Sequence, residues 1–404
     1  MGRGGQRVAG VKRHILIVHS ALRTTGGMDV VCAWAIQALH GVYEVSLATL
    51  EPVDCTALNR DYGTTLPQED FRVLIAPAGY QRARRWVPTR GAFLDISLNM
   101  RWARQLDRRN RYDVLLGTEN EIDFGRPGLH YVHHPTMYFP RPRHEMRWFH
   151  YLPGMLWAYR QLGRSISGMT DAGLRRNLAL ANSEFIRQRI HQVHGVDATI
   201  LYPPVPGHFD AVAWGDRQAG FVAIGRLDGA KRWEMALQIV EQLRSRGRDL
   251  GFTLIGHAHP SPYLSRLRSL AATRPWFRIY EHLTRDQLVA EVPRHRYALH
   301  TFENEHFGIG PAEVQNAGCI LFAHNSGGPI EIVDDARRLF DNVADAVAKI
   351  ERMLDDHALE VEFQRRVVAQ RERFSTTRFC DSLRTILTQF ERTAPAQGSG
   401  EFQS

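Results

Sequence analysis

Short apolar runs alternate with amphipathic helical stretches along most of this 404-residue chain, in two successive series. The expected strands of the first series are residues 14–20 (HILIVHS), 43–50, 71–78, 112–117, 129–134, 178–182 and 198–204. Those of the second series are residues 221–227 (FVAIGRL), 251–256, 278–283, 297–302 and 319–324. Strands that are apolar throughout and separated by helices belong to parallel sheets covered on both faces. The pattern therefore predicts an α/β protein built from doubly wound, Rossmann-like parallel sheets.

The alternation stops at residues 203–220, where three prolines and several glycines replace the periodic pattern. Prolines and glycines at this density are typical of a linker, and the chain is too long for one ordinary core. We therefore predict two domains that face each other across a cleft. The expected division is residues 1–205, residues 206–375, a C-terminal helix at 376–393 that packs back on the first domain, and a flexible tail at 394–404.

The chain has a formal net charge of +8, and nearly all of its positive charge is arginine, because Lys12, Lys231 and Lys349 are its only lysines. This bias is typical of a bacterial protein from a GC-rich genome. A positive excess suits nucleic acid, an anionic membrane or phosphorylated substrates as partners. The sequence contains no zinc-finger or RRM-type motif, so nucleic acid is not an expected partner.

The four cysteines, Cys32, Cys55, Cys319 and Cys380, are far apart and form no CxxC pair. They predict neither a zinc site nor a disulfide framework, and they fit the reducing cytoplasm. No run of about 18 apolar residues occurs, so no membrane-spanning helix is expected. We interpret the short apolar run near the N-terminus as a buried strand rather than a signal peptide.

Arginines are interleaved with aromatic residues in three stretches of the first series, residues 81–90, 101–112 and 139–164. Such stretches suit peripheral docking on an anionic bilayer, here on its cytoplasmic face. There are two alternatives. The aromatic residues could be core and the arginines a solvated face, or the arginines could bind a phosphorylated acceptor.

The segment 303–333 contains the densest group of candidate functional residues. Glu305 follows an expected strand, at the edge where open parallel sheets bind ligands. Pro311 suits the first turn of a helix, so residues 308–310 are expected to form the turn before it. That helix would offer free backbone N–H groups to an anion, and Glu313 would lie in its first turn. The alternative is that Glu313 only favours the helix dipole and that Glu305 is an ordinary surface carboxylate.

A basic pair, Arg226 and Lys231, lies where the first strand of the second series ends, in the segment GRLDGAKR. Across a strand–helix turn, an arginine and a lysine at this spacing can converge on one diphosphate. Solvated charges beside a helix start are the alternative. In the first series, Gly26 and Gly27 precede a helix, where they permit close approach of the backbone to a sugar or phosphate or form an ordinary turn.

His133 and His134 end the strand expected at 129–134. An imidazole at this position can bond to a sugar hydroxyl or to a main-chain carbonyl. Adjacent strand residues point to opposite faces, so at most one of the two is expected to face the cleft. A purely structural role is the alternative.

Taken together, these motifs resemble glycosyltransferase family 4, whose members have the GT-B fold of two Rossmann-like domains and transfer sugars from nucleotide-sugars with retention. The segments YVHHPT, LANSEFI, ILYPPV, NEHFGIG and LFAHNSGGP are most similar to the GDP-mannose-dependent α-1,2-mannosyltransferases of lipid-linked oligosaccharide assembly. The resemblance covers Ile15 to Val333. It implies a first domain that binds the acceptor and a second that binds the donor.

The resemblance also implies roles for individual residues of the second domain. Arg226 and Lys231 match the basic pair that binds the donor diphosphate. Glu305 matches the acidic residue near the donor sugar, and Glu313 matches the one that holds the ribose hydroxyls. The turn whose backbone approaches the donor is matched by Phe307, Gly308 and Ile309.

In the first domain, His133 matches the histidine that contacts the transferred sugar. Gly26 and Gly27 match the glycine loop near the donor phosphates and the acceptor. The residues that we expect to be catalytic are His133, Arg226, Lys231 and Glu305.

The expected activity is the retaining transfer of a hexose, mannose from GDP-mannose, to a hydroxyl of a glycan or lipid-linked acceptor. No D-x-D sequence occurs, so no metal is expected, and no other cofactor is. The alternatives are a transferase that uses UDP-glucose or UDP-N-acetylglucosamine in polysaccharide or natural-product glycosylation, and a non-catalytic sugar-binding protein. A nicotinamide-linked dehydrogenase is not expected, because the chain lacks GxGxxG.

Overall fold

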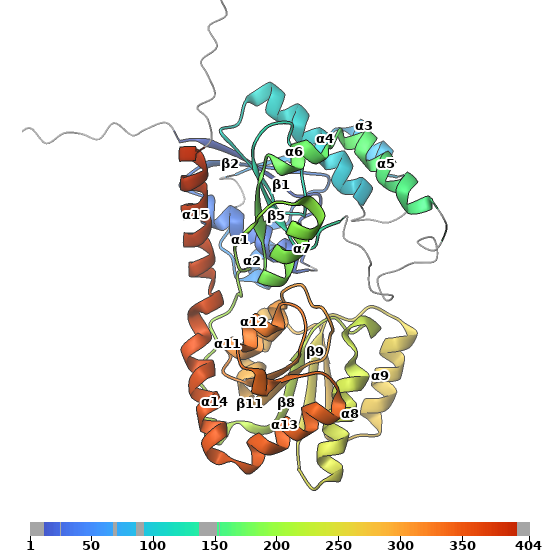
Figure 1. Ribbon diagram of the computed structural model, residues 1–404, viewed down its shortest axis with the longest axis vertical. Coiled ribbons are helices and arrows are strands. Elements are labelled where there is room, and N and C mark those ends of the chain that lie inside the picture. The colour runs from blue at the N-terminus through green and yellow to red at the C-terminus, as the bar shows by residue number, and fades with distance from the viewer. Residues whose placement is uncertain are drawn as a thin grey trace, which may run out of the picture.

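The structure is a computed structural model of the chain, and it describes residues 12–24, 26–67, 71–85, 93–136, 152 and 154–393. These residues form two α/β domains, one above the other in Figure 1. Each domain contains one sheet in which all neighbouring strands are parallel. The predicted fold class, two doubly wound parallel-sheet domains, is confirmed.

The first sheet has seven strands in the order β3-β2-β1-β4-β5-β6-β7. The strands are β1 His14–Val18, β2 Glu44–Thr49, β3 Arg72–Ile75, β4 Val114–Gly117, β5 Leu129–Val132, β6 Leu178–Ala181 and β7 Thr199–Ile200. The helices are α1 Gly27–Leu39, α2 Cys55–Tyr62, α3 Ala78–Arg84, α4 Phe93–Asn110, α5 Met155–Ser167, α6 Asp171–Arg175 and α7 Glu184–His194. The order reverses between β1 and β4, and ligands bind at the carboxyl ends of strands at such a switch point.

Both faces of the first sheet are covered by helices. Ile15 and Ile17 of β1 pack in the core that includes α1 and α2, whereas Leu16 and Val18 pack in the core that includes α4. Successive side chains of a strand point to opposite faces. A strand buried on both faces needs apolar residues at every position, which explains the unbroken apolar run of β1.

The second sheet has six strands in the order β10-β9-β8-β11-β12-β13, and its switch point lies between β8 and β11. The strands are β8 Gln218–Ile224, β9 Gly251–Gly256, β10 Phe277–Glu281, β11 His295–His300, β12 Ile320–His324 and β13 Leu339–Phe340. The helices are α8 Trp233–Ser245, α9 Pro262–Ala272, α10 Arg285–Glu291, α11 Ile309–Asn316, α12 Pro329–Val333, α13 Val343–Asp355, α14 His357–Gln370 and α15 Thr376–Thr393. β13 was not predicted, because its two apolar residues stand alone between charged residues, whereas the equally short β7 lies within a longer apolar run.

The chain passes between the two domains at two places that lie side by side. After β7, residues 201–213 contain no helix or strand and lead into the second domain. The chain returns near Ser375, which forms a parallel bridge with Val205. The N–H of Val205 donates to the carbonyl of Phe374 at 3.0 Å. The two crossings are therefore bonded to each other.

The last helix, α15, packs along the first domain beside α1 (Figure 1). Phe379, Leu383 and Leu387 are buried in the first-domain core. The Nε of Arg384 donates to the carbonyl of Ala38 in α1 at 2.7 Å. The C-terminal segment of the chain thus completes the core of the N-terminal domain.

Parts of the predicted arginine–aromatic stretches, residues 86–90, 139–151 and 153, lie outside the described residues. The described parts lie in α3, α4 and α5. Among the residues that the structure describes, no helix is both long and apolar enough to cross a bilayer.

Replacing Leu383 by alanine should lower the free energy of unfolding by about 3 kcal/mol, because it opens a cavity in the first-domain core. Urea denaturation followed by circular dichroism measures the change. Gln389→Ala, at an exposed position of the same helix, is the matched control and should change stability by less than about 0.5 kcal/mol. A loss at Leu383 no larger than that of the control would contradict the docking of α15 on the first domain.

Candidate functional site

The second domain places a tightly packed turn at its switch point, directly after β8. The turn begins at Gly225, and Gly256 at the end of the neighbouring strand β9 must be a glycine, because a Cβ on it would overlap the carbonyl oxygen of Gly225. The residues after Gly225 include a single 3-10 turn, Gly229–Lys231, whose start is capped by the side chain of Asp228. The hydroxyl of Thr301, at the end of β11, donates to the carbonyl of Lys231 at 3.0 Å. The turn after β8 and the end of β11 are thus held together.

Lys231 and Glu305 form an ion pair at the carboxyl edge of the second sheet. Both side chains are largely buried. The Nζ of Lys231 also lies 4.4 Å from the ring centroid of Phe302, and the Nε2 of His300 lies 3.7 Å from the Glu305 carboxylate. Sequence separation between the pair is large, yet the switch point brings them together, as expected for residues that follow neighbouring strands.

The charge of Glu305 is fixed by this pair. Burial raises the pKa of its carboxyl, but the charge and hydrogen bond of Lys231 and the neighbouring His300 and His306 together outweigh burial and lower the pKa to about 2. Burial also lowers the pKa of His300 to about 3, so its ring is neutral at pH 7. The site therefore presents the Glu305 carboxylate beside Lys231 in a largely buried environment, where electrostatic interactions are strong.

Helix α11 begins closer to the sheet than the sequence suggested. Its first residue is Ile309, with Gly308 as N-cap at φ +101°, so Ile309 and Gly310 belong to the helix and not to a preceding turn. A Cβ on Gly310 would lie 2.6 Å from the carbonyl oxygen of Ile224 in β8. Only glycine permits this approach, which sets the N-terminus of α11 against the end of β8.

Glu313 lies beyond the first turn of α11, contrary to the prediction, because the helix starts two residues earlier than expected. Its side chain is buried and forms an ion pair with Arg285. Arg285 in turn donates to the carbonyl of Pro206 in the linker. The structure therefore joins Glu313 to α10 and to the interdomain crossing, and its role at a ribose stays a prediction.

Arg226 is on the same turn as Lys231, but its guanidinium is 63% exposed. Its Nε lies 3.4 Å from the carboxylate of Asp228. Phe307 is buried between Tyr202 and Phe374, at centroid distances of 6.0 and 5.3 Å. Phe307 thus packs the turn of residues 304–308 against Tyr202 and Phe374. The guanidinium of Arg226, in contrast, is accessible from solvent.

The glycine loop of the first domain meets this turn. A Cβ on Gly27 would lie 3.1 Å from the Cδ1 of Ile309. Gly26 is the N-cap of α1, and the hydroxyl of Tyr62 donates to its carbonyl at 3.4 Å. Gly26 and Gly27 therefore lie at the domain interface, beside the N-terminus of α11.

His133 and His134 both follow β5, which ends at Val132, so the expected alternation of strand faces does not apply to them. The Nε2 of His133 lies 3.1 Å from the carbonyl of Thr118. Burial lowers the pKa of His133 to about 3. The ring of His134 stacks on that of His306 in the second domain, with centroids 4.3 Å apart and planes 10° apart. His134 therefore contacts the other domain, whereas His133 is fixed from within the first.

A polar segment directly after β4, residues 118–123, positions the loops around this side of the site. The sequence analysis did not single it out. The carboxylate of Glu119 accepts the N–H of Ser20 at 2.7 Å. The side-chain oxygen of Asn120 accepts the N–H groups of both His133 and His134, each at 2.9 Å. The signal in the sequence was a run of acidic and amide residues, TENEID, after a buried strand.

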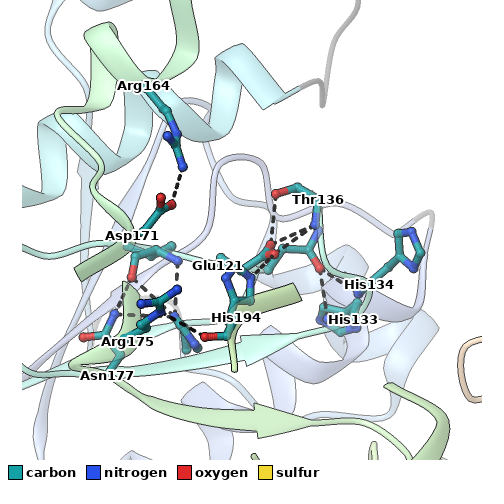
Figure 2. Close-up of polar contacts among 12 residues, drawn as sticks. Glu121, His133, His134, Thr136, Arg164, Asp171, Arg175, Asn177 and His194 are labelled. Carbon is teal, nitrogen blue, oxygen red and sulfur yellow. Dashed lines mark hydrogen bonds and ion pairs between the residues drawn. The ribbon is translucent and has the colours of Figure 1, made fainter. Parts of the chain in front are cut away.

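Glu121, in the same segment, anchors the next part of the chain, as Figure 2 shows. Its carboxylate accepts the N–H of Thr136 at 3.0 Å and lies 3.1 Å from the Nε2 of His194, near the end of α7. Burial raises the pKa of Glu121, but the partner His194 and the amide of Thr136 lower it overall. Asp123 accepts the N–H and hydroxyl of Thr170 before α6. One short segment thus holds several loops.

The two domains are joined at the N-terminus of α7. The hydroxyl of Ser183 donates to the carbonyl of His306 at 2.6 Å. The carboxylate of Glu331, in α12 of the second domain, accepts the N–H of Glu184 and the hydroxyl of Tyr202, each at 2.7 Å. A carboxylate at a helix N-terminus is favourable, and these contacts hold the turn of residues 304–308 against the first domain.

A metal site is not evident in the described part of the chain, where no three His, Cys, Asp or Glu side chains are arranged to hold an ion.

Residues 208–371 match the family described as glycosyl transferases group 1. The chain is 27% identical over 206 residues to the GDP-Man:Man(3)GlcNAc(2)-PP-Dol alpha-1,2-mannosyltransferase of Dictyostelium discoideum. The matched region covers 46% of this chain and 41% of that protein. The chain is also 27% identical over 174 residues to the mouse protein of the same name, with 38% and 35% covered. The match thus spans about two-fifths of the length of these relatives or less.

Two solved structures are similar to the chain over nearly its whole length. One is WaaG, a glycosyltransferase involved in lipopolysaccharide biosynthesis, with a TM-score of 0.67, 12% identity, and 93% of this chain and 99% of that chain covered. The other is a glycosyltransferase from Rickettsia africae, with a TM-score of 0.63, 13% identity, and 95% and 100% covered. At this identity they establish the fold, and the predicted GT-B architecture is confirmed.

Replacing Asn120 by alanine should lower the free energy of unfolding by about 2 kcal/mol, because two backbone N–H groups lose their acceptor. Asn120 also has φ +65°, which alanine disfavours. Thermal unfolding and hydrogen exchange at the amides of His133 and His134 measure the effect. Asn120→Asp keeps the acceptor and is the matched control; faster exchange in both variants alike would argue against this anchoring role.

Mild acid should destabilise the folded chain already at pH values above those at which carboxylates usually titrate. His133, His300 and His306 have folded pKa values of about 3, 3 and 4, lowered by burial, whereas an exposed histidine titrates near 6.5. The unfolded state therefore binds more protons, so stability falls as pH drops from about 6.5 towards 4, by about 2 kcal/mol per histidine at pH 5. Urea midpoints between pH 7 and 5 test this, and His300→Asn should flatten the dependence. A midpoint independent of pH in this window would refute it.

Proposed function

Because residues 208–371 form a domain of the group 1 glycosyltransferases, we propose that the chain transfers a hexose from a nucleotide-sugar to a hydroxyl of a glycan or lipid-linked acceptor. The observation that carries the proposal is the buried pair of Lys231 and Glu305 at the switch point of the second sheet. Gly27 and His134 of the first domain lie beside the same turn. A donor diphosphate would meet Lys231, and the hydroxyls of its sugar would meet Glu305.

The proposed catalysis is electrostatic. As the glycosidic bond breaks, negative charge grows on the departing diphosphate and positive charge on the sugar ring. Lys231, the exposed guanidinium of Arg226 and the first N–H groups of α11 would stabilise the diphosphate in a preorganised site. These groups supply the positive charge that a metal ion supplies elsewhere, so the proposed reaction is independent of metal. Retention would follow if the acceptor attacks the face that the diphosphate leaves, with the diphosphate accepting the hydroxyl proton.

His133 is proposed to contact the transferred sugar as a neutral imidazole. A backbone carbonyl only accepts, so the 3.1 Å contact with Thr118 requires the proton on Nε2. Nδ1 is then an acceptor, and a pKa of about 3 keeps the ring in this form at pH 7. An acceptor nitrogen suits a sugar hydroxyl, which can donate to it.

GDP-mannose is the proposed donor, supported by the names of the relatives, which specify GDP-Man and an alpha-1,2-mannosyltransferase. The same names specify a dolichol-linked acceptor, which supports a lipid-linked acceptor here. We place the protein in the cytoplasm, in peripheral contact with an anionic membrane. The net charge of +8 supports this contact.

Hydrolysis of a panel of GDP- and UDP-sugars in the presence of EDTA tests the proposal, with released nucleotide as the readout. We expect turnover of GDP-mannose, and a loss of about 100-fold or more in Lys231→Ala and Glu305→Ala, because each removes a charged group from the reacting centre. Lys12→Ala, at an exposed lysine outside the site, is the matched control and should keep full activity.

Three results would argue against the proposal in different ways. Turnover that both site variants retain would place the chemistry elsewhere. Turnover of a UDP-sugar alone would replace the proposed donor. Loss of activity in EDTA that Mg²⁺ or Mn²⁺ restores would exclude the metal-independent reaction.

A further inference from the structure

The outward face of α5 carries large apolar side chains in an unusual concentration. Met155, Trp157 and Leu162 are 45%, 67% and 51% exposed, and Leu152, just before the helix, is 42% exposed. Burial of a large apolar side chain has a favourable free energy. Proteins without a partner therefore seldom expose several such side chains next to one another. This face therefore has the character of an interaction surface.

One side of the helix is anchored against α4. A Cβ on Gly163 would collide with the ring of Phe93 in α4, and the ring of Phe93 lies 6.1 Å from that of Tyr159. At 100° per residue, Trp157 points away from Tyr159 and Gly163, whereas Leu162 lies on the flank of the helix and Met155 is exposed at its first turn. The other exposed residues of α5 are Ala158 and Ser165, and its two arginines, Arg160 and Arg164, are only partly exposed. The fully exposed residues among the described side chains of α5 are thus all uncharged, the reverse of an ordinary surface helix.

The neighbouring helices expose only positive charge. α3 and α5 contain no acidic residue, and both acids of α4, Asp95 and Asp107, are buried and paired with arginines. The exposed arginines of this layer are Arg82, Arg85, Arg101, Arg108 and Arg109. In Figure 1, α3, α4 and α5 lie together at the upper right of the first domain.

We propose that this layer, hereafter the α3–α5 surface, docks on an anionic lipid bilayer. Trp157, Met155 and Leu162 would enter the boundary between headgroups and acyl chains, where amphipathic helices insert their apolar faces. The arginines of α3 and α4 would meet the phosphates of anionic lipids. The inference rests on the proposed function, because a lipid-linked acceptor would be presented to the first domain from that membrane.

A second copy of the chain fits the α3–α5 surface less well. A symmetric contact would bring the same patch of both copies together. The exposed arginines would then face arginines, with no exposed carboxylate of α3, α4 or α5 to pair with them. Repulsion of this kind disfavours association, whereas a bilayer that contains anionic lipid complements both the apolar and the charged parts.

The full-length protein should sediment with vesicles of phosphatidylcholine mixed with phosphatidylglycerol. Binding should weaken at high salt and with phosphatidylcholine alone. The double variant Trp157→Glu, Leu162→Glu should bind roughly tenfold or more weakly, because both changes place charge in the inserted face. Val368→Glu, at an exposed apolar position of α14 in the second domain, is the matched control and should bind as the parent does. Arg108→Gln, Arg109→Gln should weaken binding only to the anionic vesicles.

Hydrolysis of the water-soluble donor by the double variant separates this inference from the proposed function. Unchanged hydrolysis with lost vesicle binding supports the α3–α5 surface, and the same circular dichroism spectrum as the parent shows that the variant is folded. Equal vesicle binding by the double variant and the parent overturns the inference, even if donor hydrolysis is found. A parent that ignores vesicles but forms a dimer that the double variant abolishes assigns the surface to a second copy instead.

Discussion

The geometry of the candidate site depends on the hydrogen bonds that the carboxylate of Glu331 accepts. This carboxylate lies in the second domain, yet it accepts the first N–H of α7 in the first domain, a group that the helix itself cannot satisfy. The hydroxyl of Ser183 adds a bond to the carbonyl of His306 at the same place. Because His306 is part of the turn that follows Glu305, this seam decides where the second-domain turn lies relative to His134 and Gly27.

The same requirement, that buried polar groups find partners, shapes each domain at its switch point. In the first domain, Asn120 and Glu121 hold the loop after β5 through backbone N–H groups. In the second, the hydroxyl of Thr301 holds the turn that carries Lys231. The polar side chains that follow the central strands are thus divided between two tasks. Some fix the loops, and a few, such as Lys231 and Glu305, pair with each other at the carboxyl edge of the sheet.

Much of the fold followed from the period of the apolar residues, since strands buried on both faces leave an unmistakable pattern. The proximity of Lys231 and Glu305 also followed, because both come after strands that flank the switch point. The pairing of Glu313 with Arg285 did not, since it depends on how α10 docks beside the linker. Nor did the start of α11, which is set by the left-handed conformation of Gly308 rather than by Pro311. Such contacts depend on tertiary packing that no local pattern records.

The bonded pair of crossings at Val205 and Phe374 has a mechanical consequence. A domain attached by one strand of chain can twist and translate freely, but two adjacent strands resist both kinds of movement. What they leave is rotation about a line through the crossings, with the smallest displacement beside them and the largest at the opposite edge of the molecule. Such a rotation would separate the facing residues of the two domains progressively with distance from the crossings, while the bond between Val205 and Phe374 persists.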